Sequence, residues 1–184
     1  KMSGSSNFET RESSQLGMLG RDYRGVHFEL LCETGDRVRA GVAVMRDARR
    51  PDILFTAPAA GRVARVVRGA RRKLVALQIE VDVSGEVAEL AAPAGQDQAA
   101  QRAFMLASGS WASLRTRPFG NIPDPATQPA AVLITAIESE PMAPPVAPVI
   151  DAFAAEFSAA VTMLARISSA PLFICHAPEY RTAF

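Results

Sequence analysis

Arginines carry most of the candidate chemistry in this chain. The segment Arg115-Thr116-Arg117-Pro118-Phe119-Gly120 combines two guanidinium groups with an aromatic ring. Pro118 disfavours helical geometry at Arg117, which predicts an extended loop. Guanidinium groups bond planar anions through paired hydrogen bonds. Through Arg115, Arg117 and Phe119 the loop could bind a phosphate, a carboxylate or a partner. Alternatively, it could clamp one domain onto the other by pairing with buried carboxylates.

A second group of cations surrounds Gly69 and consists of Arg68, Arg71, Arg72 and Lys73. The flanking residues are rich in valine and alternate in polarity, which predicts that the cluster occupies the tip of a β-hairpin. The tip is either a solvated surface or a contact surface for an acidic partner or lipid headgroups, since basic residues near a membrane attract anionic lipid. We expect no nucleic acid as partner, because the interleaved aromatic residues that stack on bases are missing.

Metal, disulfide and nucleophile motifs are not found in the sequence. Cys32 and Cys175 are the two cysteines of the 184-residue chain, and their separation indicates neither a metal motif nor a disulfide framework. We expect both to be small buried residues. A [4Fe–4S] cluster usually needs four cysteines. His27 and His176 stand alone, and we expect structural roles for them. The net charge of +1 gives no overall case for an acidic partner.

The stretch from Gly35 to Glu80 reads as two short β-rich halves joined by a loop. The first half contains the sequence GDRVRAG and the second contains APAAGRV, each with a glycine turn and alternating valines. Leu16–Leu19 and Leu74–Val81 are predicted strands on either side. Met45–Asp52 is predicted as a hairpin between the halves.

The second half of the chain changes to helical and buried-strand patterns. Residues 96–107 predict an amphipathic helix with Ala100, Phe104 and Ala107 on one side. The apolar runs 130–137 and 170–177 predict buried parallel strands, and the periodicity of 149–168 predicts one helix between them. Such a unit would place Glu138, Ser139, Glu140 and His176 at the carboxyl ends of its strands. Ligands favour that edge, but no Gly-rich phosphate loop is present there.

The two glycine turns resemble those of biotinyl and lipoyl carrier domains, which are flattened barrel-sandwich folds. In those domains an exposed hairpin between the halves carries a modified lysine. The corresponding hairpin, Met45–Asp52, has no lysine, and an arginine cannot replace the amine because it stays protonated. The resemblance therefore implies the fold without the carrier function.

A longer resemblance runs from about Leu19 to Pro178. FTAPAAGRVARVVRGARRKLVALQIEV at 55–81, SGSWASLRTRPFGNIP at 108–123 and AVLITAIESEPMAPP at 131–145 follow one another at the spacing seen in the NqrA family, a component of the Na+-translocating NADH:quinone reductase. RTRPF is its most distinctive part. The subunit of a related electron-transport complex that carries iron–sulfur clusters shares the barrel-sandwich. NqrA is normally more than twice this length, so we expect a truncated chain.

Patterns and resemblance together predict a mixed α+β chain. We expect a barrel-sandwich hybrid module, then a helical linker and a partial, Rossmann-like βαβ unit. The predicted boundaries are a tag remnant or disordered tail over 1–18, the barrel-sandwich over 19–83, the linker over 84–129, the βαβ unit over 130–178 and a tail over 179–184. No stretch approaches the roughly 18 apolar residues that span a bilayer.

The resemblance implies a peripheral, cofactor-free subunit on the cytoplasmic side of the bacterial inner membrane. Flavins and an iron–sulfur centre would lie in other subunits of the complex, which would be its partners, and ubiquinone is a candidate ligand near Arg115, Arg117 and Phe119. Such a subunit would not be catalytic alone. Two alternatives stay open: a non-catalytic adaptor with a lipoyl-like fold, and an electron-transfer subunit whose cluster-binding segment lies outside this chain.

Overall fold

A computed structural model describes residues 12–83, 85–91, 93–138 and 141–177. Two units divide the chain. The β unit comprises residues 12–95 and 102–126, and the α/β unit comprises residues 96–101 and 127–177. Helix α1 (Gln98–Ala107) is shared between them, since the division falls after Gln101.

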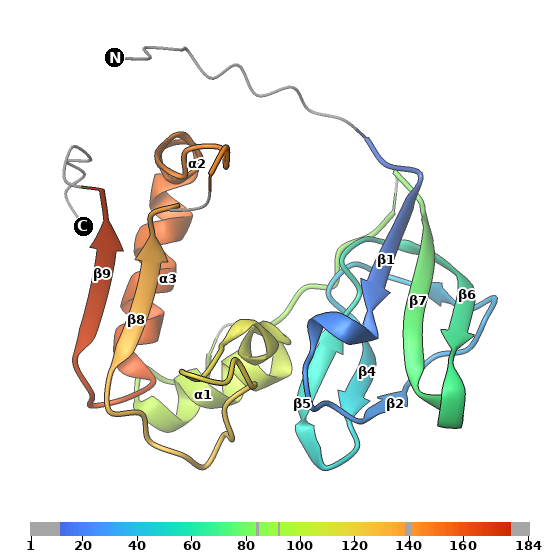
Figure 1. The fold of residues 1–184 in the computed structure, drawn as a ribbon, viewed down its shortest axis with the longest axis horizontal. Helices are drawn as coiled ribbons and strands as arrows, with labels where there is room; N and C mark the ends of the chain where they lie inside the picture. Colours follow the sequence, from blue (N-terminus) through green and yellow to red (C-terminus); the bar gives the residue numbers. More distant parts are fainter. Residues whose placement is uncertain (1–11, 84, 92, 139–140, 178–184) are drawn as a thin grey trace. The chain divides into compact units, whose positions relative to one another are not determined.

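Two antiparallel sheets form the β unit (Figure 1). The first has the order β1-β7-β6-β3 and the second β2-β4-β5. The strands are β1 (Gln15–Leu19), β2 (Phe28–Leu30), β3 (Arg37–Val38), β4 (Ala43–Asp47), β5 (Arg50–Thr56), β6 (Gly61–Arg68) and β7 (Leu74–Val81). β1 pairs with β7, so the sheet begins at Gln15, within the predicted tail 1–18. Residues 1–11 of that tail lie outside the described residues.

The two predicted halves interlock through their glycine turns. β3 from the first half pairs with β6 from the second, with Val38 opposite Gly61. The Gly41 N–H donates to the Ala57 carbonyl at 2.9 Å, and the Ala57 N–H donates to the Val42 carbonyl at 2.8 Å. The core between the sheets is formed by fully buried apolar side chains: Val44, Met45, Ile53, Phe55, Val63, Leu77 and Ile79. This arrangement satisfies each turn's backbone groups while it closes the sandwich.

Most of the predicted hairpin Met45–Asp52 belongs to strands rather than to an exposed loop. Met45 and Asp47 belong to β4 and are 1% exposed, and Arg50 already begins β5. The turn itself is therefore only Ala48–Arg49, and both of its residues are exposed.

The predicted linker 84–129 is wrong in its middle part, because residues 102–126 belong to the β unit. The 3-10 helix η3 (Ser110–Ser113) packs on β5. Gly109 precedes it with φ of +74°, and a Cβ atom there would lie 2.8 Å from Thr56. The segment contributes buried side chains, including Met105, Trp111 and Ile122. These apolar residues, lacking any regular period, gave no sequence signal that they pack on the sandwich.

Helix α1 begins and ends close to its predicted bounds, but its buried side differs. Gln101 and Met105 are the buried residues, four positions apart, while Ala107 is exposed. Of the residues predicted for the apolar side, Ala100 and Phe104 are half-buried, and the prediction is wrong for Ala107. Two further 3-10 turns complete the β unit: η1 (Gly20–Asp22) and η2 (Ala70–Arg72).

The α/β unit contains one parallel strand pair, β8 (Val132–Ala136) and β9 (Leu172–His176). Between them the predicted single helix is two helices, α2 (Ala147–Ala152) and α3 (Ala154–Arg166). They separate at Phe153, whose backbone leaves the helical region and whose side chain is 58% exposed. The Rossmann-like assignment stays a prediction, because one strand pair does not define that topology.

The prediction that β8 and β9 are buried is wrong for one of their faces. Leu133 and Phe173 are register partners, and they are 58% and 53% exposed. The residues on either side of each are half-buried, so burial alternates with the strand period of two, except at the end of β9, where Cys175 and His176 are both exposed. A continuous apolar run predicts that both faces of a strand are buried, but in this strand pair one face is largely exposed.

Candidate functional site

The segment Arg115–Gly120 is a compact loop closed by its own backbone. The Thr116 N–H donates to the Asn121 carbonyl at 2.8 Å, and the Gly120 N–H donates to the Thr116 carbonyl at 2.8 Å. Gly120 has φ of +69°, and a Cβ atom there would meet no atom within 4 Å. The loop therefore presents its apex to open space while its base is held.

Arg115 is engaged within the β unit. Its Nη1 donates to the carbonyls of Ala112 at 2.6 Å and Leu114 at 2.9 Å. Its guanidinium also lies 5.7 Å from the centre of the Tyr23 ring. Tyr23 in turn makes edge contacts with Phe28 and Phe55. Arg115 thus anchors the loop on an aromatic cluster through a cation–π contact.

Arg117 and Phe119 project outward from the same loop. Arg117 is exposed, and the Phe119 side chain is 70% exposed. Within the described residues neither Arg115 nor Arg117 pairs with a carboxylate. The predicted pairing of these two arginines with buried carboxylates is therefore not formed in the described residues. The loop instead exposes the guanidinium group of Arg117 and the ring of Phe119.

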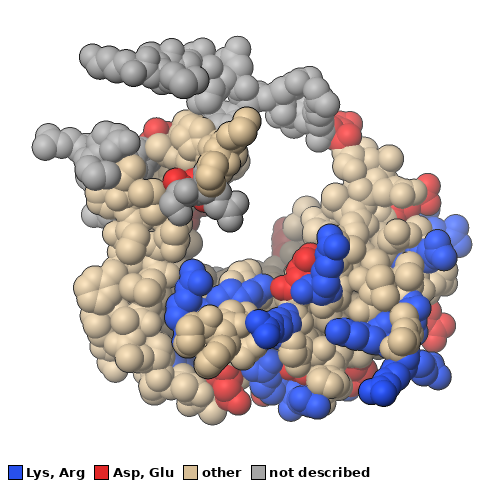
Figure 2. Space-filling view, in the orientation of Figure 1, with Lys and Arg blue, Asp and Glu red and all other residues tan. Residues whose placement is uncertain are grey.

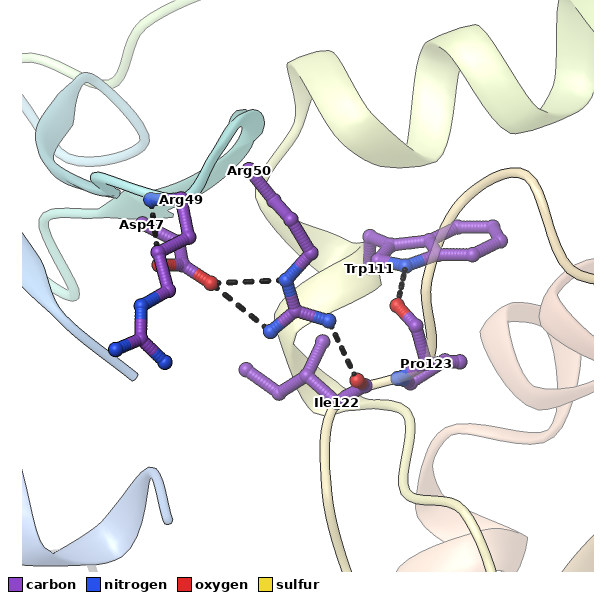
Figure 3. A network of polar contacts seen from close by, with 6 residues as sticks. All are labelled: Asp47, Arg49, Arg50, Trp111, Ile122 and Pro123. Carbon is purple, nitrogen blue, oxygen red and sulfur yellow. Dashed lines mark hydrogen bonds and ion pairs between the residues drawn. The ribbon is translucent and has the colours of Figure 1, made fainter. Parts of the chain in front are cut away.

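A buried carboxylate is paired with an arginine inside the β unit, but the arginine is Arg50, and the contact joins two segments of one unit rather than two domains. Asp47 is 1% exposed, and its Oδ2 accepts a hydrogen bond from the Arg50 Nε at 2.9 Å and forms an ion pair with the Arg50 Nη2, also at 2.9 Å (Figure 3). The Arg49 backbone N–H donates to the other oxygen, Oδ1, at 3.1 Å. The Nη1 of Arg50 then donates to the Ile122 carbonyl at 2.9 Å. A charge-assisted network therefore joins the β4–β5 hairpin to the segment that follows the loop.

Trp111 fixes the same segment from its other side. Its indole Nε1 donates to the Pro123 carbonyl at 3.0 Å, and its side chain is 2% exposed (Figure 3). Arg102 lies 5.7 Å from the Trp111 ring centre and donates to the Pro125 carbonyl at 2.7 Å. Sequence analysis missed Arg50, Asp47 and Arg102. The short spacing between Asp47 and Arg50 in the hairpin could have indicated their ion pair. The carbonyl groups that Arg50 and Arg102 contact are distant in sequence and could not have been predicted from it.

The hairpin that would carry a modified lysine has other charged residues. Arg46 and Glu29 are opposite each other on β4 and β2 and form two hydrogen bonds at 2.9 and 2.8 Å. The hydrogen bonds from Arg46 hold the pKa of the Glu29 carboxyl below its ordinary value. Lys73 is the only lysine among the described residues, and it lies between β6 and β7. The described hairpin therefore offers no amine for attachment of biotin or lipoate.

The basic cluster lies where the sequence predicts it, at the connection between β6 and β7. Arg68 ends β6, Arg71 and Arg72 lie in η2, and Lys73 precedes β7; all four are exposed. We call residues 68–73 the basic tip. Lys and Arg side chains gather on the β unit in Figure 2, whereas few are seen on the α/β unit.

The two cysteines and the carboxyl ends of β8 and β9 were the other places in the sequence where chemistry was considered. Cys32 is half-buried and its Sγ donates to the Val44 carbonyl, while burial, and then the nearby Asp36 carboxylate, raise the pKa of its thiol. Cys175 is exposed, so the prediction that both are buried is wrong for it. At the carboxyl edge of the strands His176 is exposed, and Ser139 and Glu140 lie outside the described residues.

Metal-binding clusters and membrane-spanning helices are not found in the described residues. No group of three or more His, Cys, Asp or Glu side chains is close enough to hold a metal ion among them. Likewise, no helix in the described part of the chain is long and apolar enough to cross a bilayer.

Comparison with known proteins finds one family for both units. Residues 3–82 match the NqrA N-terminal barrel-sandwich hybrid domain, and residues 96–184 match the NqrA second alpha/beta domain. The NqrA component of the Na(+)-translocating NADH-quinone reductase from Serratia proteamaculans is 36% identical over 171 residues, covering 88% of this chain and 37% of that protein.

The corresponding proteins from two other bacteria are similarly close. The Klebsiella pneumoniae protein is 35% identical over 167 residues, covering 88% of this chain and 37% of its own length. The Pseudomonas aeruginosa protein is 34% identical over 171 residues, covering 91% of this chain and 38% of that protein. The chain thus spans a little over a third of these relatives, and it belongs to the NqrA family of Na+-translocating NADH-quinone reductase subunits.

Proposed function

We propose that this chain is a peripheral, non-catalytic part of a sodium-translocating NADH-quinone reductase, where it binds the other subunits and contacts the quinone. The observation that carries the proposal is the family match across both units, in sequence order. The relatives are named as subunits of that reductase. We further propose a position on the cytoplasmic side of the bacterial inner membrane.

The loop Arg115–Gly120 supports the quinone part of the proposal on physical grounds. An exposed aromatic ring can stack on a flat quinone ring. A nearby guanidinium can donate hydrogen bonds to a quinone oxygen, and it favours the charge that develops on reduction. Phe119 and Arg117 offer these two groups on one loop. The bonds from Arg115 and Arg50 to backbone carbonyls hold that loop, so a ligand would not have to order it.

We propose that the chain carries no cofactor and that flavins and the iron–sulfur centre reside in other subunits. The supporting observations are the lysine-free hairpin and the lack of a metal-binding group in the described residues. The chain would then position partners and ligand without transferring electrons itself. An adaptor module, the alternative function, would assemble with the same partners but would bind no quinone.

Quinone binding by the isolated chain tests the central claim. Trp111 is the single tryptophan and lies just before the loop, so quenching of its fluorescence by a short-chain ubiquinone reports binding. We expect saturable quenching, and we expect Phe119→Ala to weaken it about tenfold through the lost stacking. Phe153→Ala is the matched control, because Phe153 is also exposed but lies in the α/β unit.

Three results would contradict this function. Equal weakening by the two alanine variants would remove the loop as the quinone contact. Failure of the chain to co-elute with reductase subunits prepared without NqrA would contradict the assembly role. Oxidation of NADH by the pure chain would contradict a non-catalytic part. Co-elution without any quinone binding would favour the adaptor.

A further inference from the structure

The basic tip lies in a stretch of unbalanced charge. No acidic residue occurs between Asp52 and Glu80, whereas six cationic residues occur there. These are Arg62, Arg65, Arg68, Arg71, Arg72 and Lys73. The last four lie at or next to the connection between β6 and β7, at one end of the sheet (Figure 1). Their positive potential therefore concentrates at one end of the hairpin.

The backbone of the basic tip is unusual. Arg71 and Arg72 have φ of +54° and +58°, the left-handed region that L-residues with a Cβ atom rarely occupy. The Gly69 N–H donates to the Lys73 carbonyl at 2.8 Å, and Arg68 donates to the Arg72 carbonyl at 3.0 Å. Backbone conformations of this kind at bulky residues cluster at functional sites. Glycine would fit this turn more easily, yet two arginines occupy it.

The cations of the basic tip have no acidic partner in the described part of the chain. Arg71, Arg72 and Lys73 are exposed, and no ion pair to a described carboxylate involves them. Val75 follows them closely in the chain and is 47% exposed, and a Cβ atom at Gly69 would lie 3.0 Å from its Cγ2. A projecting turn thus combines unpaired cations with a small apolar side chain.

We propose that the basic tip binds the anionic headgroups of a lipid bilayer. Long, exposed cationic side chains on one short connection suit a surface that accepts negative charge at any position. An acidic protein would instead need carboxylates at fixed positions opposite the long side chains of the short connection 69–73. Val75, which is 47% exposed, adds apolar surface next to these cations. The inference does not depend on the proposed function, because its test requires only this chain and lipid.

Vesicle sedimentation tests the proposal. We expect the chain to bind vesicles of phosphatidylcholine with about 30% phosphatidylserine at low salt, to bind pure phosphatidylcholine far less, and to dissociate as salt rises. The triple variant Arg71→Gly, Arg72→Gly and Lys73→Ser keeps a turn that glycine accommodates. It should lower the partition coefficient about 100-fold.

A matched variant removes the same charge elsewhere on the β unit. Arg21→Gln, Arg24→Gln and Arg39→Gln are all exposed positions, and we expect less than a roughly threefold loss from this control. Circular dichroism of both variants confirms the fold before vesicles are added. An equal loss in the two variants would show a general charge effect and overturn the proposal. Binding of polyglutamate in preference to the anionic vesicles would also overturn it, in favour of an acidic protein partner.

Discussion

The two units of this chain differ in charge and in how they cover their apolar surface. The residue ranges of the β unit contain 16 basic and 12 acidic residues, whereas those of the α/β unit contain one basic and five acidic residues. The β unit packs two sheets around a fully buried core. The α/β unit leaves Leu133 and Phe173 exposed on one face of its strand pair.

From this difference we expect the two units to contribute unequally to the chain's stability and to its binding surfaces. Parallel strands are usually covered on both faces, so β8 and β9 form a less complete sheet than those of the β unit. The β unit has a closed core and a loop tied down by Arg50, Arg115 and Trp111. We therefore expect the β unit to supply most of the chain's stability and its binding surfaces.

The largest expected effect compares two phenylalanines. Phe55 is 2% exposed in the β unit core, and Phe173 is 53% exposed in the α/β unit. Phe55→Ala should lower the free energy of unfolding by about 3–5 kcal/mol, since it leaves a cavity, and Phe173→Ala by about 1 kcal/mol or less. Urea unfolding followed by Trp111 fluorescence measures the first. Far-UV circular dichroism measures the second, because Trp111 reports on the β unit. Similar costs for the two variants would break the comparison.

The next effect concerns the ion pair of Asp47 with Arg50. Asp47→Asn leaves the guanidinium of Arg50, whose side chain is 27% exposed, without its carboxylate partner, so we expect a loss of about 2 kcal/mol. Asp52→Asn is the control, because Asp52 is exposed on the same hairpin, and it should change stability by less than about 0.5 kcal/mol. Both are read by urea unfolding. If the Asp47 variant were as stable as its control, the ion pair would not stabilise the β unit.

The smallest effect uses the one cysteine that each unit contains. Burial and the Asp36 carboxylate raise the pKa of the Cys32 thiol, so its reactive thiolate is scarcer at neutral pH. Cys175 is exposed in the α/β unit. Iodoacetamide at pH 8 should therefore label Cys175 about tenfold faster than Cys32, with mass spectrometry as the readout.

The labelling rate of Cys32 should continue to rise with pH beyond about 8.5, the ordinary pKa of cysteine. Faster labelling of Cys32 than of Cys175 would contradict the assignment of half-buried and exposed thiols to the two units. The single-cysteine variants Cys32→Ser and Cys175→Ser assign each rate to its residue.

Local patterns in the sequence were sufficient for several elements. Alternating valines and paired glycine turns predicted the strands of the β unit, because the strand period of two is imposed by the backbone itself. The same local information placed Arg68–Lys73 at a hairpin tip. The RTRPF segment and its neighbours carried the family resemblance, which the comparison with known proteins confirmed. All of these features depend on residues close together in the chain.

Tertiary structure alone decided which side chains meet. Arg50 and Ile122 are far apart in sequence. The acceptor is a backbone carbonyl, which every residue type has, so the sequence gives no sign of which residue Arg50 contacts. For the same reason Arg115, for which pairing with a buried carboxylate was one of two predicted roles, contacts carbonyls and a tyrosine ring instead. Burial of an apolar run also depends on what packs against it, so Cys175 and Leu133 could be placed on strands but not assigned to a covered or an open face.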